Sequence, residues 1–381
     1  MSENQQVRDF ETRGIEFSLS NKSDKENVMI EMLSYLKLHQ LGSAVKITEL
    51  NQETSALISF SLKEEYRNKW APNWDTTRLY ERLSLKGYKV INDLNKEILV
   101  GMLLAPIPFQ FPSYDEFHSA IQIRHHTVLA GYLAALNFDT NATERPEKYW
   151  HYDEDDGFLL NKGQSIIEAL ISATQPQEED KAYAFSCYRA TEYVILLAIS
   201  RKLKKVNPLL LKRLEERSEK RAIRSGEFHE LFLKEYGSLE DPLPMKYYVP
   251  GDRVWFRNPD SRSSDISGYE GSWVIYLGHN LFTNFWKRDQ PFTLESKCVE
   301  VYHWKDGAYL DQNGELLMNE NIVESCVAQS LADPKEVQRI LQRMMRYRDP
   351  KGVYDQGGCI DTSRESPRFV CPGTSDIKIP D

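Results

Sequence analysis

The residue with the clearest capacity for chemistry is Cys187. It follows a polar, acidic loop from Gln175 to Asp180 and precedes an apolar run from Tyr193 to Ile199. This pattern predicts a buried helix that begins at Cys187. A thiol in the first turn of a helix lies at the positive end of the helix dipole, which favours the thiolate, the form that attacks carbonyl carbon. The alternative is that Cys187 is a small buried apolar residue, as most free cysteines are.

A cysteine nucleophile that attacks amides needs a base, donors for an oxyanion and an exit for the leaving amine. Four residues that follow Cys187 in the chain are candidate bases: His279, His303, Glu270 and Asp252. This order matches papain-like enzymes, in which the cysteine opens a helix and the base lies on a later sheet.

Four tryptophans in the second half could form one wall of a cleft, although packing within a sheet explains them equally well. They are Trp255, Trp273, Trp286 and Trp304.

Composition narrows the class of protein. The chain has 381 residues, a net charge of −9 and five cysteines with no Cys-x-x-Cys pair. The charge gives no reason to expect nucleic acid, and the cysteines form neither a zinc motif nor a disulfide framework. No segment has the length of apolar sequence that a membrane span needs, and the polar N-terminus lacks a signal-peptide pattern. We therefore expect a cytoplasmic protein, or an exported effector without a cleaved signal peptide.

Sequence motifs predict no metal and no cofactor. The pair His229-Glu230 begins a metalloprotease motif, but the second histidine is replaced by Leu233. The acidic cluster from Asp153 to Asp156 lacks the spacing of a calcium loop. No phosphate-binding or dinucleotide-binding loop is present.

Periodicity predicts an α+β protein with several segments. Residues 1–26 are polar and predict a flexible arm. Residues 27–104 predict a small α+β unit, with a helix over 28–41, a strand over 54–62, a helix over 75–85, and short strands over 88–92 and 98–104. The Pro-rich stretch 105–112 marks a boundary.

After this boundary, Ser113 and Glu116 predict a capped helix that runs to about Leu136. The remaining predicted elements are a helix over 163–173, the Cys187 helix to about residue 203, a basic solvated helix face over 201–224, strands over 247–256 and 272–277, a hairpin over 297–317, a helix over 334–346, and an irregular tail over 346–381.

Several stretches together resemble the small bacterial (spore-coat type) transglutaminases. The segment Tyr183 to Cys187, followed by an apolar helix, is similar to that family's Tyr-Ala-Phe-Glu-Cys. Three further stretches occur in the same order, and they are 108–136, Tyr149-Trp150 with 163–173, and 251–259 with 271–278.

The resemblance implies a papain/NlpC-P60-like α+β core over residues 105–345, to which the unit 27–104 is added. It implies that Cys187 attacks the γ-carboxamide of protein glutamine, releases ammonia and passes the acyl group to lysine, or to water in a deamidation. No cofactor is implied. Ser272, Trp273 and Trp255, on the matching strands, are the expected substrate-binding residues.

Three positions depart from the family pattern. Ser272 replaces a catalytic glutamate, Ser186 replaces the glutamate before the cysteine, and no histidine stands in register near Phe285. A serine hydroxyl is no useful base at neutral pH. The role could have passed to Glu270, which shares a strand face with Ser272, or to His279 just after the strand.

The leading hypothesis is therefore a Cys187-dependent transglutaminase or glutamine deamidase that acts on protein substrates. Two alternatives remain open. One is a catalytically inactive, transglutaminase-like interaction module. The other is a protease or amidase of the same broad fold.

Overall fold

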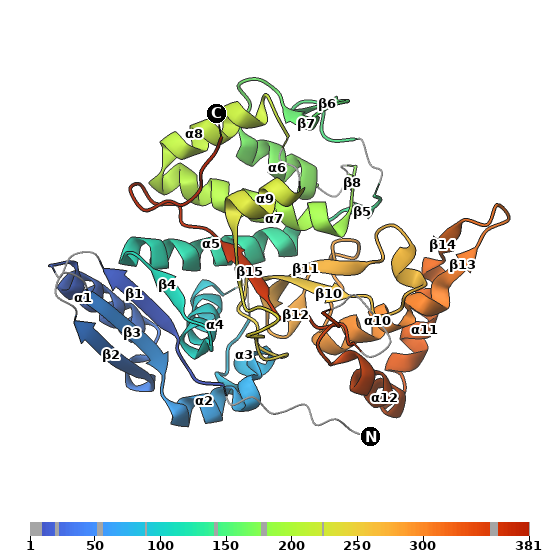
Figure 1. Cartoon of the computed structure of the whole chain (residues 1–381). Helices are drawn as coiled ribbons and strands as arrows, with labels where there is room; N and C mark the ends of the chain where they lie inside the picture. The colour runs from blue at the N-terminus through green and yellow to red at the C-terminus, as the bar shows by residue number, and fades with distance from the viewer. Residues whose placement is uncertain are drawn as a thin grey trace.

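The computed structural model describes residues 10–19, 23–51, 56–87, 90–140, 144–176, 181–222, 225–350 and 357–380. Within them the fold is mixed α+β, as predicted, with several small sheets and many helices. Figure 1 shows a sheet of N-terminal strands on one side, a second sheet near the centre and a group of helices from the last third of the chain on the other side. Within these ranges, no helix is long and apolar enough to cross a membrane.

The N-terminal sheet has the strand order β2-β3-β1-β4. Its strands are β1 (Ile15–Leu19), β2 (Val45–Asn51), β3 (Ala56–Leu62) and β4 (Phe109–Phe111), and α1 (Ser23–Leu38) follows β1. β3 alternates buried and half-buried residues, which confirms the strand predicted there.

Several expectations for the N-terminal region differ from the structure. The predicted flexible arm contains β1, a buried strand inside the sheet, whereas residues 1–9 and 20–22 lie outside the described residues. β1 pairs in parallel with β4, so the sheet crosses the boundary predicted at residue 105. The apolar run 98–104 belongs to a buried helix, α4 (Ile91–Leu104), and not to a strand.

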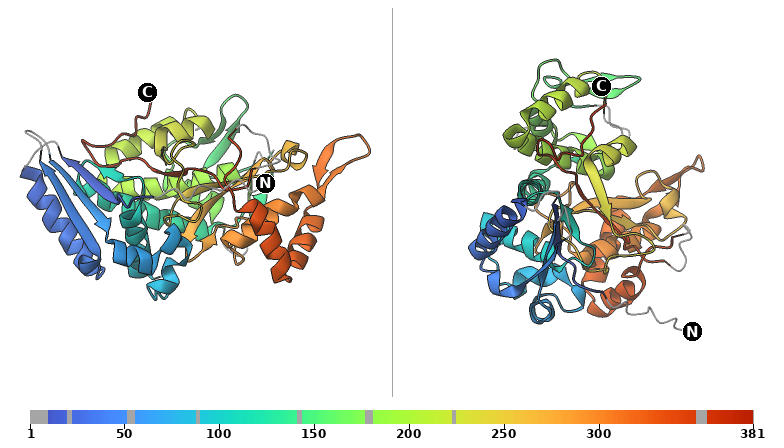
Figure 2. Two further views of the ribbon diagram at one scale, coloured as in Figure 1. Left: turned by 60° about the horizontal axis from the view of Figure 1, so that its bottom comes forward. Right: turned by 60° about the vertical axis from the view of Figure 1, so that its left-hand side comes forward.

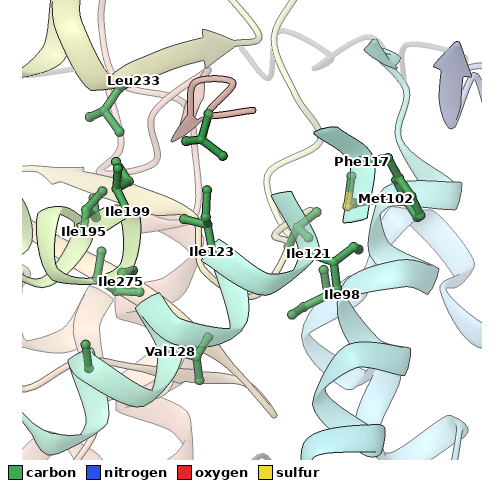
Figure 3. Packing of buried hydrophobic residues seen from close by; sticks show 14 of the residues in the cluster. Ile98, Met102, Phe117, Ile121, Ile123, Val128, Ile195, Ile199, Leu233 and Ile275 are labelled. Carbon is green, nitrogen blue, oxygen red and sulfur yellow. The ribbon is translucent and has the colours of Figure 1, made fainter. Parts of the chain in front are cut away.

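Two long helices, α5 (Tyr114–Leu133) and α7 (Cys187–Val206), pack against each other and against the central sheet. Ser113 caps α5 by accepting a hydrogen bond from the Glu116 N–H at 3.3 Å, as predicted. Figure 3 shows how Ile195 and Ile199 of α7 meet Ile275 of the sheet in one buried cluster.

The central sheet has the strand order β12-β11-β10-β15-β9. Its strands are β9 (Leu233–Tyr236), β10 (Arg253–Arg257), β11 (Gly271–Gly278), β12 (Leu281–Phe282) and β15 (Arg364–Pro367). β15 lies between β10 and β9, so part of the C-terminal segment predicted to be irregular forms an interior strand. Its sequence, Arg-Glu-Ser-Pro, lacks the apolar alternation that would have indicated a strand.

The two faces of this sheet contact different cores. Ile275 belongs to the core that includes α5 and α7. Every second residue of β10 and β11 points to the other face. These residues, among them Phe256 and Val274, belong to a second core with α10 (Leu294–Gly307). α11 (Glu320–Leu331) and α12 (Pro334–Met344) complete that side, as the two turned views in Figure 2 show.

The hairpin predicted over 297–317 is only half present. Its first half is α10, and the hairpin consists of β13 (Ala308–Leu310) and β14 (Leu316–Met318) around Asn313-Gly314. The remaining helices and short strands are α2 (Glu64–Trp70), α3 (Leu79–Arg82), β5 (Asn137–Phe138), β6 (Trp150–Asp153), β7 (Gly157–Leu160), α6 (Ile166–Thr174), β8 (Ala184–Phe185), α8 (Pro208–Ser218) and α9 (Ser225–Phe232).

Candidate active site

Cys187 is the first residue of α7, where the sequence predicted it. Ser186 caps the helix, because its hydroxyl oxygen accepts a hydrogen bond from the Arg189 N–H at 3.3 Å. The chain enters the helix through β8, which pairs in parallel with β5. Pairing and capping together fix the direction in which the Cys187 side chain leaves the helix.

The Cys187 thiol lies beside β11. The backbone N–H groups of Trp273 and Tyr188 donate hydrogen bonds to its Sγ. β12 and Thr283 bond to β11 at Ile275 and beyond, so Trp273 lies outside the paired part of this edge. The arrangement therefore places two N–H donors around a sulfur atom, as a reacting thiolate or an oxyanion needs.

Electrostatics at the thiol act in opposite directions. Cys187 is partly exposed as a residue, yet burial has the largest effect and raises the pKa of its thiol. The N–H donors and the positive charges of Lys297 and Arg253 lower the pKa, but they do not offset burial. The depressed pKa that the helix dipole alone would give is thus not found, and most of the thiol is protonated at neutral pH.

Two of the expected substrate-binding residues form a stack next to this thiol. The rings of Trp255 and Trp273 lie 5.6 Å apart with an interplanar angle of 10°. The Tyr188 ring meets Trp273 edge-on at 5.4 Å. The Arg253 guanidinium lies 4.1 Å from the centre of the Trp273 ring and 4.2 Å from that of Tyr188. The structure thus brings both tryptophans to the side of Cys187.

Arg253 begins a buried chain of polar contacts that sequence reasoning missed. Its Nε donates to Thr191 Oγ1 at 2.8 Å, and its Nη1 donates to Glu365 Oε2 at 2.8 Å. The other oxygen of Glu365 lies 2.9 Å from His229 Nδ1. Burial would raise the pKa of Glu365, but His229 and Arg253 lower it on balance, and the bond to Glu365 raises the pKa of His229.

Glu270 and Ser272 lie at the same end of β11 as Trp273. Ser272 is buried and lies opposite Phe256 on the neighbouring strand. Both residues are on the sheet face that meets α10. Glu270 is exposed just before the strand, and its Oε2 accepts a hydrogen bond from the Gly268 N–H at 3.0 Å. It stands three residues from Trp273, which is roughly 10 Å along a strand.

His279 lies at the opposite end of β11. Six residues separate it from Trp273, or roughly 20 Å along the strand. Its Nε2 is 3.3 Å from Glu97 Oε2, and its ring stacks on Tyr80 at 4.8 Å. A direct proton transfer between His279 and Cys187 therefore has no geometric support.

The environment of His279 suits a structural role. Glu97 is fully buried, and burial raises its pKa to about 8. Burial also lowers the pKa of His279, so both groups are neutral at pH 7. Glu97 Oε1 accepts the His279 N–H at 2.9 Å and so fixes the turn after β11 to α4.

The other two candidate bases also have structural partners. Asp252 is completely buried and pairs with Arg124 at 2.6 Å. It also accepts the Val249 N–H at 2.8 Å. His303 lies on α10, where its two ring nitrogens form hydrogen bonds with Asp306 and Ser330.

Comparison with known proteins identifies the family. A sequence model described as protein-glutamine gamma-glutamyltransferase matches residues 80–370, which is more than half of the chain. The chain belongs to this family, as the resemblance implied. The match supports glutamine acyl transfer as the class of reaction, and protein glutamine as the class of substrate.

Among solved structures, the chain is similar to the transglutaminase from Geobacillus stearothermophilus without its C-terminal extension. The two share 19% identity over 56% of this chain and 98% of that chain, with a TM-score of 0.37. No curated protein matches the chain.

Proposed function

We propose that the chain is a protein-glutamine acyltransferase in which Cys187 forms the thioester. The observation that carries this proposal is the position of Cys187 in the family-matched segment, where it begins α7 and receives hydrogen bonds from two backbone N–H groups. This combination of a helix-terminal cysteine and an antiparallel sheet also motivates the papain-like interpretation of the core.

The first half of the proposed reaction releases ammonia. Cys187 Sγ attacks the γ-carboxamide carbon of glutamine, and the resulting oxyanion accepts hydrogen bonds from backbone N–H groups at the start of α7. The carbon–nitrogen bond then breaks, and the leaving nitrogen takes the thiol proton and departs as ammonia. The acyl group remains on Cys187 as a thioester.

The second half of the reaction determines the product. A lysine amine that attacks the thioester gives an isopeptide bond and restores the thiol, whereas water gives glutamate. We propose Glu270 as the group that carries protons in both halves, because it is exposed at the same end of β11 as Trp273, where its Oε2 accepts a backbone N–H. The stacked rings of Trp255 and Trp273 would form one wall beside the glutamine side chain.

The test is the intact mass of casein whose lysines have been methylated, after incubation with the protein and a fluorescent amine. We expect wild type to attach the amine, or to convert amide to acid, and Cys187→Ala to do neither while it unfolds at the same temperature. Cys326→Ala, which removes another partly exposed thiol, is the matched control and should retain activity. Activity in Cys187→Ala would refute the proposal.

The second candidate is an inactive member of the family that binds glutamine-bearing partners without reacting. Three observations favour it: Ser186 serves as a helix cap, Ser272 is buried, and burial raises the pKa of the Cys187 thiol. Under this alternative, wild type and Cys187→Ala would bind the same glutamine peptide equally, and neither would release ammonia.

A further inference from the structure

Three side chains with metal-binding atoms meet between α10 and α11, in a region that the Cys187 reaction does not use. His303, Asp306 and Cys326 each offer one such atom, and these atoms all lie within 4.8 Å of one another. An imidazole nitrogen, a carboxylate oxygen and a sulfur atom are thus held in one small volume.

Rigid elements create this cluster. His303 and Asp306 are three residues apart on α10, so they share one helix face. Cys326 and Ser330 are four residues apart and share a face of α11. The hairpin β13–β14 joins the two helices, which pack along their lengths.

The hydrogen bonds of His303 resemble those of a histidine that binds a metal and is held in place by a neighbouring residue. His303 Nδ1 lies 2.6 Å from Asp306 Oδ2, and its Nε2 lies 2.8 Å from Ser330 Oγ. In metal centres, the ring nitrogen that does not bind the metal usually has a hydrogen-bond partner that fixes the ring. Ser330 provides that partner here, while Nδ1 faces the carboxylate.

One side of the cluster is buried and the other side faces solvent. His303 and Ser330 are buried, whereas the Asp306 side chain is 40% exposed and Cys326 is partly exposed. An ion could therefore enter from solvent over Asp306 and Cys326, and one coordination position would stay open.

We propose that His303, Asp306 and Cys326 bind a thiophilic divalent cation of the Zn²⁺ type. Sulfur and imidazole ligands favour Zn²⁺ over Ca²⁺ and Mg²⁺, which prefer oxygen ligands. Three protein ligands leave the fourth tetrahedral position to water. The spacing of these residues matches no metal-binding sequence motif, which explains why the sequence alone predicted no metal.

Binding changes the protonation of the cluster in a defined way. The Cys326 thiol loses its proton to solvent and binds as thiolate. His303 binds the metal through Nδ1 and carries its proton on Nε2, which donates to Ser330 Oγ. The bound ion connects the end of α10 to α11 at the base of the β13–β14 hairpin.

The test is titration of the full chain with Co²⁺, followed by Zn²⁺ competition. Cys187→Ala is the background for every sample, so that this thiol cannot contribute. We expect one Co²⁺ per chain, with the absorption band of a thiolate–cobalt bond, and displacement by Zn²⁺. Cys326→Ser should remove the band. Ser330→Ala should keep it and weaken binding about tenfold, as loss of a supporting partner does.

The matched control is Asp311→Asn, at the turn of the β13–β14 hairpin and outside the cluster. It should bind Co²⁺ as the background protein does. The proposal is overturned if no thiolate band forms, or if the band persists in Cys326→Ser, because Cys298 and Cys359, whose sulfur atoms lie 3.5 Å apart, would then be its source. Cys326 is partly exposed, so its substitution by serine is expected to leave folding intact.

Discussion

The two ends of β11 carry titratable residues in very different surroundings. At the Cys187 end, Trp273 meets the thiol of a partly exposed residue, and Glu270 faces solvent. At the His279 end, the neighbouring groups are buried and paired, with Glu97 against His279. The ionisable residues that flank this one strand therefore differ in exposure, and we propose chemistry for those near Cys187 and a framework role for those near His279.

The exposure of the residues at each end separates the two cases, because Glu270 is exposed and Cys187 is partly exposed, whereas Glu97 is completely buried. A buried pair keeps its neighbours in place but has no access to a protein substrate. A thiol on a partly exposed residue, beside N–H donors and cations, suits the proposed reaction better. The comparison predicts that changes at the Cys187 end reduce activity and leave stability intact, whereas changes at the His279 end alter stability and leave activity intact.

The largest expected effect is on activity at the Cys187 end. Glu270→Gln should reduce amine incorporation about 100-fold, the usual range for loss of a general acid–base group, without a change in unfolding temperature. The measurement is the initial rate of fluorescent amine incorporation into methylated casein. Asp265→Asn, an acid in the same loop, is the control and should retain the wild-type rate. An unchanged rate in Glu270→Gln would remove Glu270 from the reaction.

The next effect is on stability, near the His279 end. Arg124→Met leaves the buried Asp252 carboxylate without its cation and should cost roughly 3–5 kcal/mol of unfolding free energy. Denaturant unfolding measures this cost. Lys212→Met, which removes an exposed helix pair with Glu216, should leave the unfolding free energy almost unchanged. Equal effects of the two variants would contradict the structural role assigned to Arg124.

Glu97→Gln should change how stability depends on pH. The pKa of Glu97 is about 8 in the folded state and about 4.5 in the unfolded chain. Between these values the unfolded chain releases a proton that the folded state keeps, so wild type loses stability as pH rises from 4.5 to 8, by an amount on the order of a few kcal/mol.

The glutamine side chain cannot ionise, and its amide keeps an oxygen for the His279 N–H. Glu97→Gln should therefore lack this decline and exceed wild type in stability at pH 8.5. Urea unfolding at pH 5 and pH 8.5 is the measurement. Parallel pH profiles for the two proteins would show that Glu97 is ionised in the folded state.

The smallest effect returns to the Cys187 end. Lys297→Met removes a positive charge that lowers the pKa of the thiol, so alkylation of Cys187 by iodoacetamide at pH 8 should slow about threefold. Lys305→Met, on the same helix but over the Tyr302 ring, is the control and should leave the rate unchanged. The pKa of the thiol is already raised, so alkylation of wild type should continue to accelerate above pH 9.

The predictable parts of the fold are those in which apolar spacing and capping act locally. The Cys187 helix, the Ser113 cap and strand β11 follow from short patterns, whereas β10 begins at Arg253 and not at residue 247 as predicted. The strand predicted over 98–104 was wrong, because a continuous apolar segment is compatible with a buried strand and with a buried helix.

The site itself was less predictable, because long-range pairing creates it. Glu365 contacts Arg253 because β15 lies between β10 and β9 in the sheet. His229 joins this contact chain from α9, and Lys297 approaches Cys187 from α10, a helix that the sequence pattern suggested was part of a hairpin. None of these approaches leaves a signal in local spacing.

The most direct test of the central claim is to trap the acyl group on Cys187. The protein is incubated with a glutamine peptide without any amine, quenched in acid and digested, and the modified cysteine is located by mass spectrometry. We predict a thioester on the peptide that contains Cys187, which hydroxylamine removes and which is absent from Cys187→Ala. An acyl group on another cysteine, or ammonia release with no acyl group on Cys187, would contradict the account.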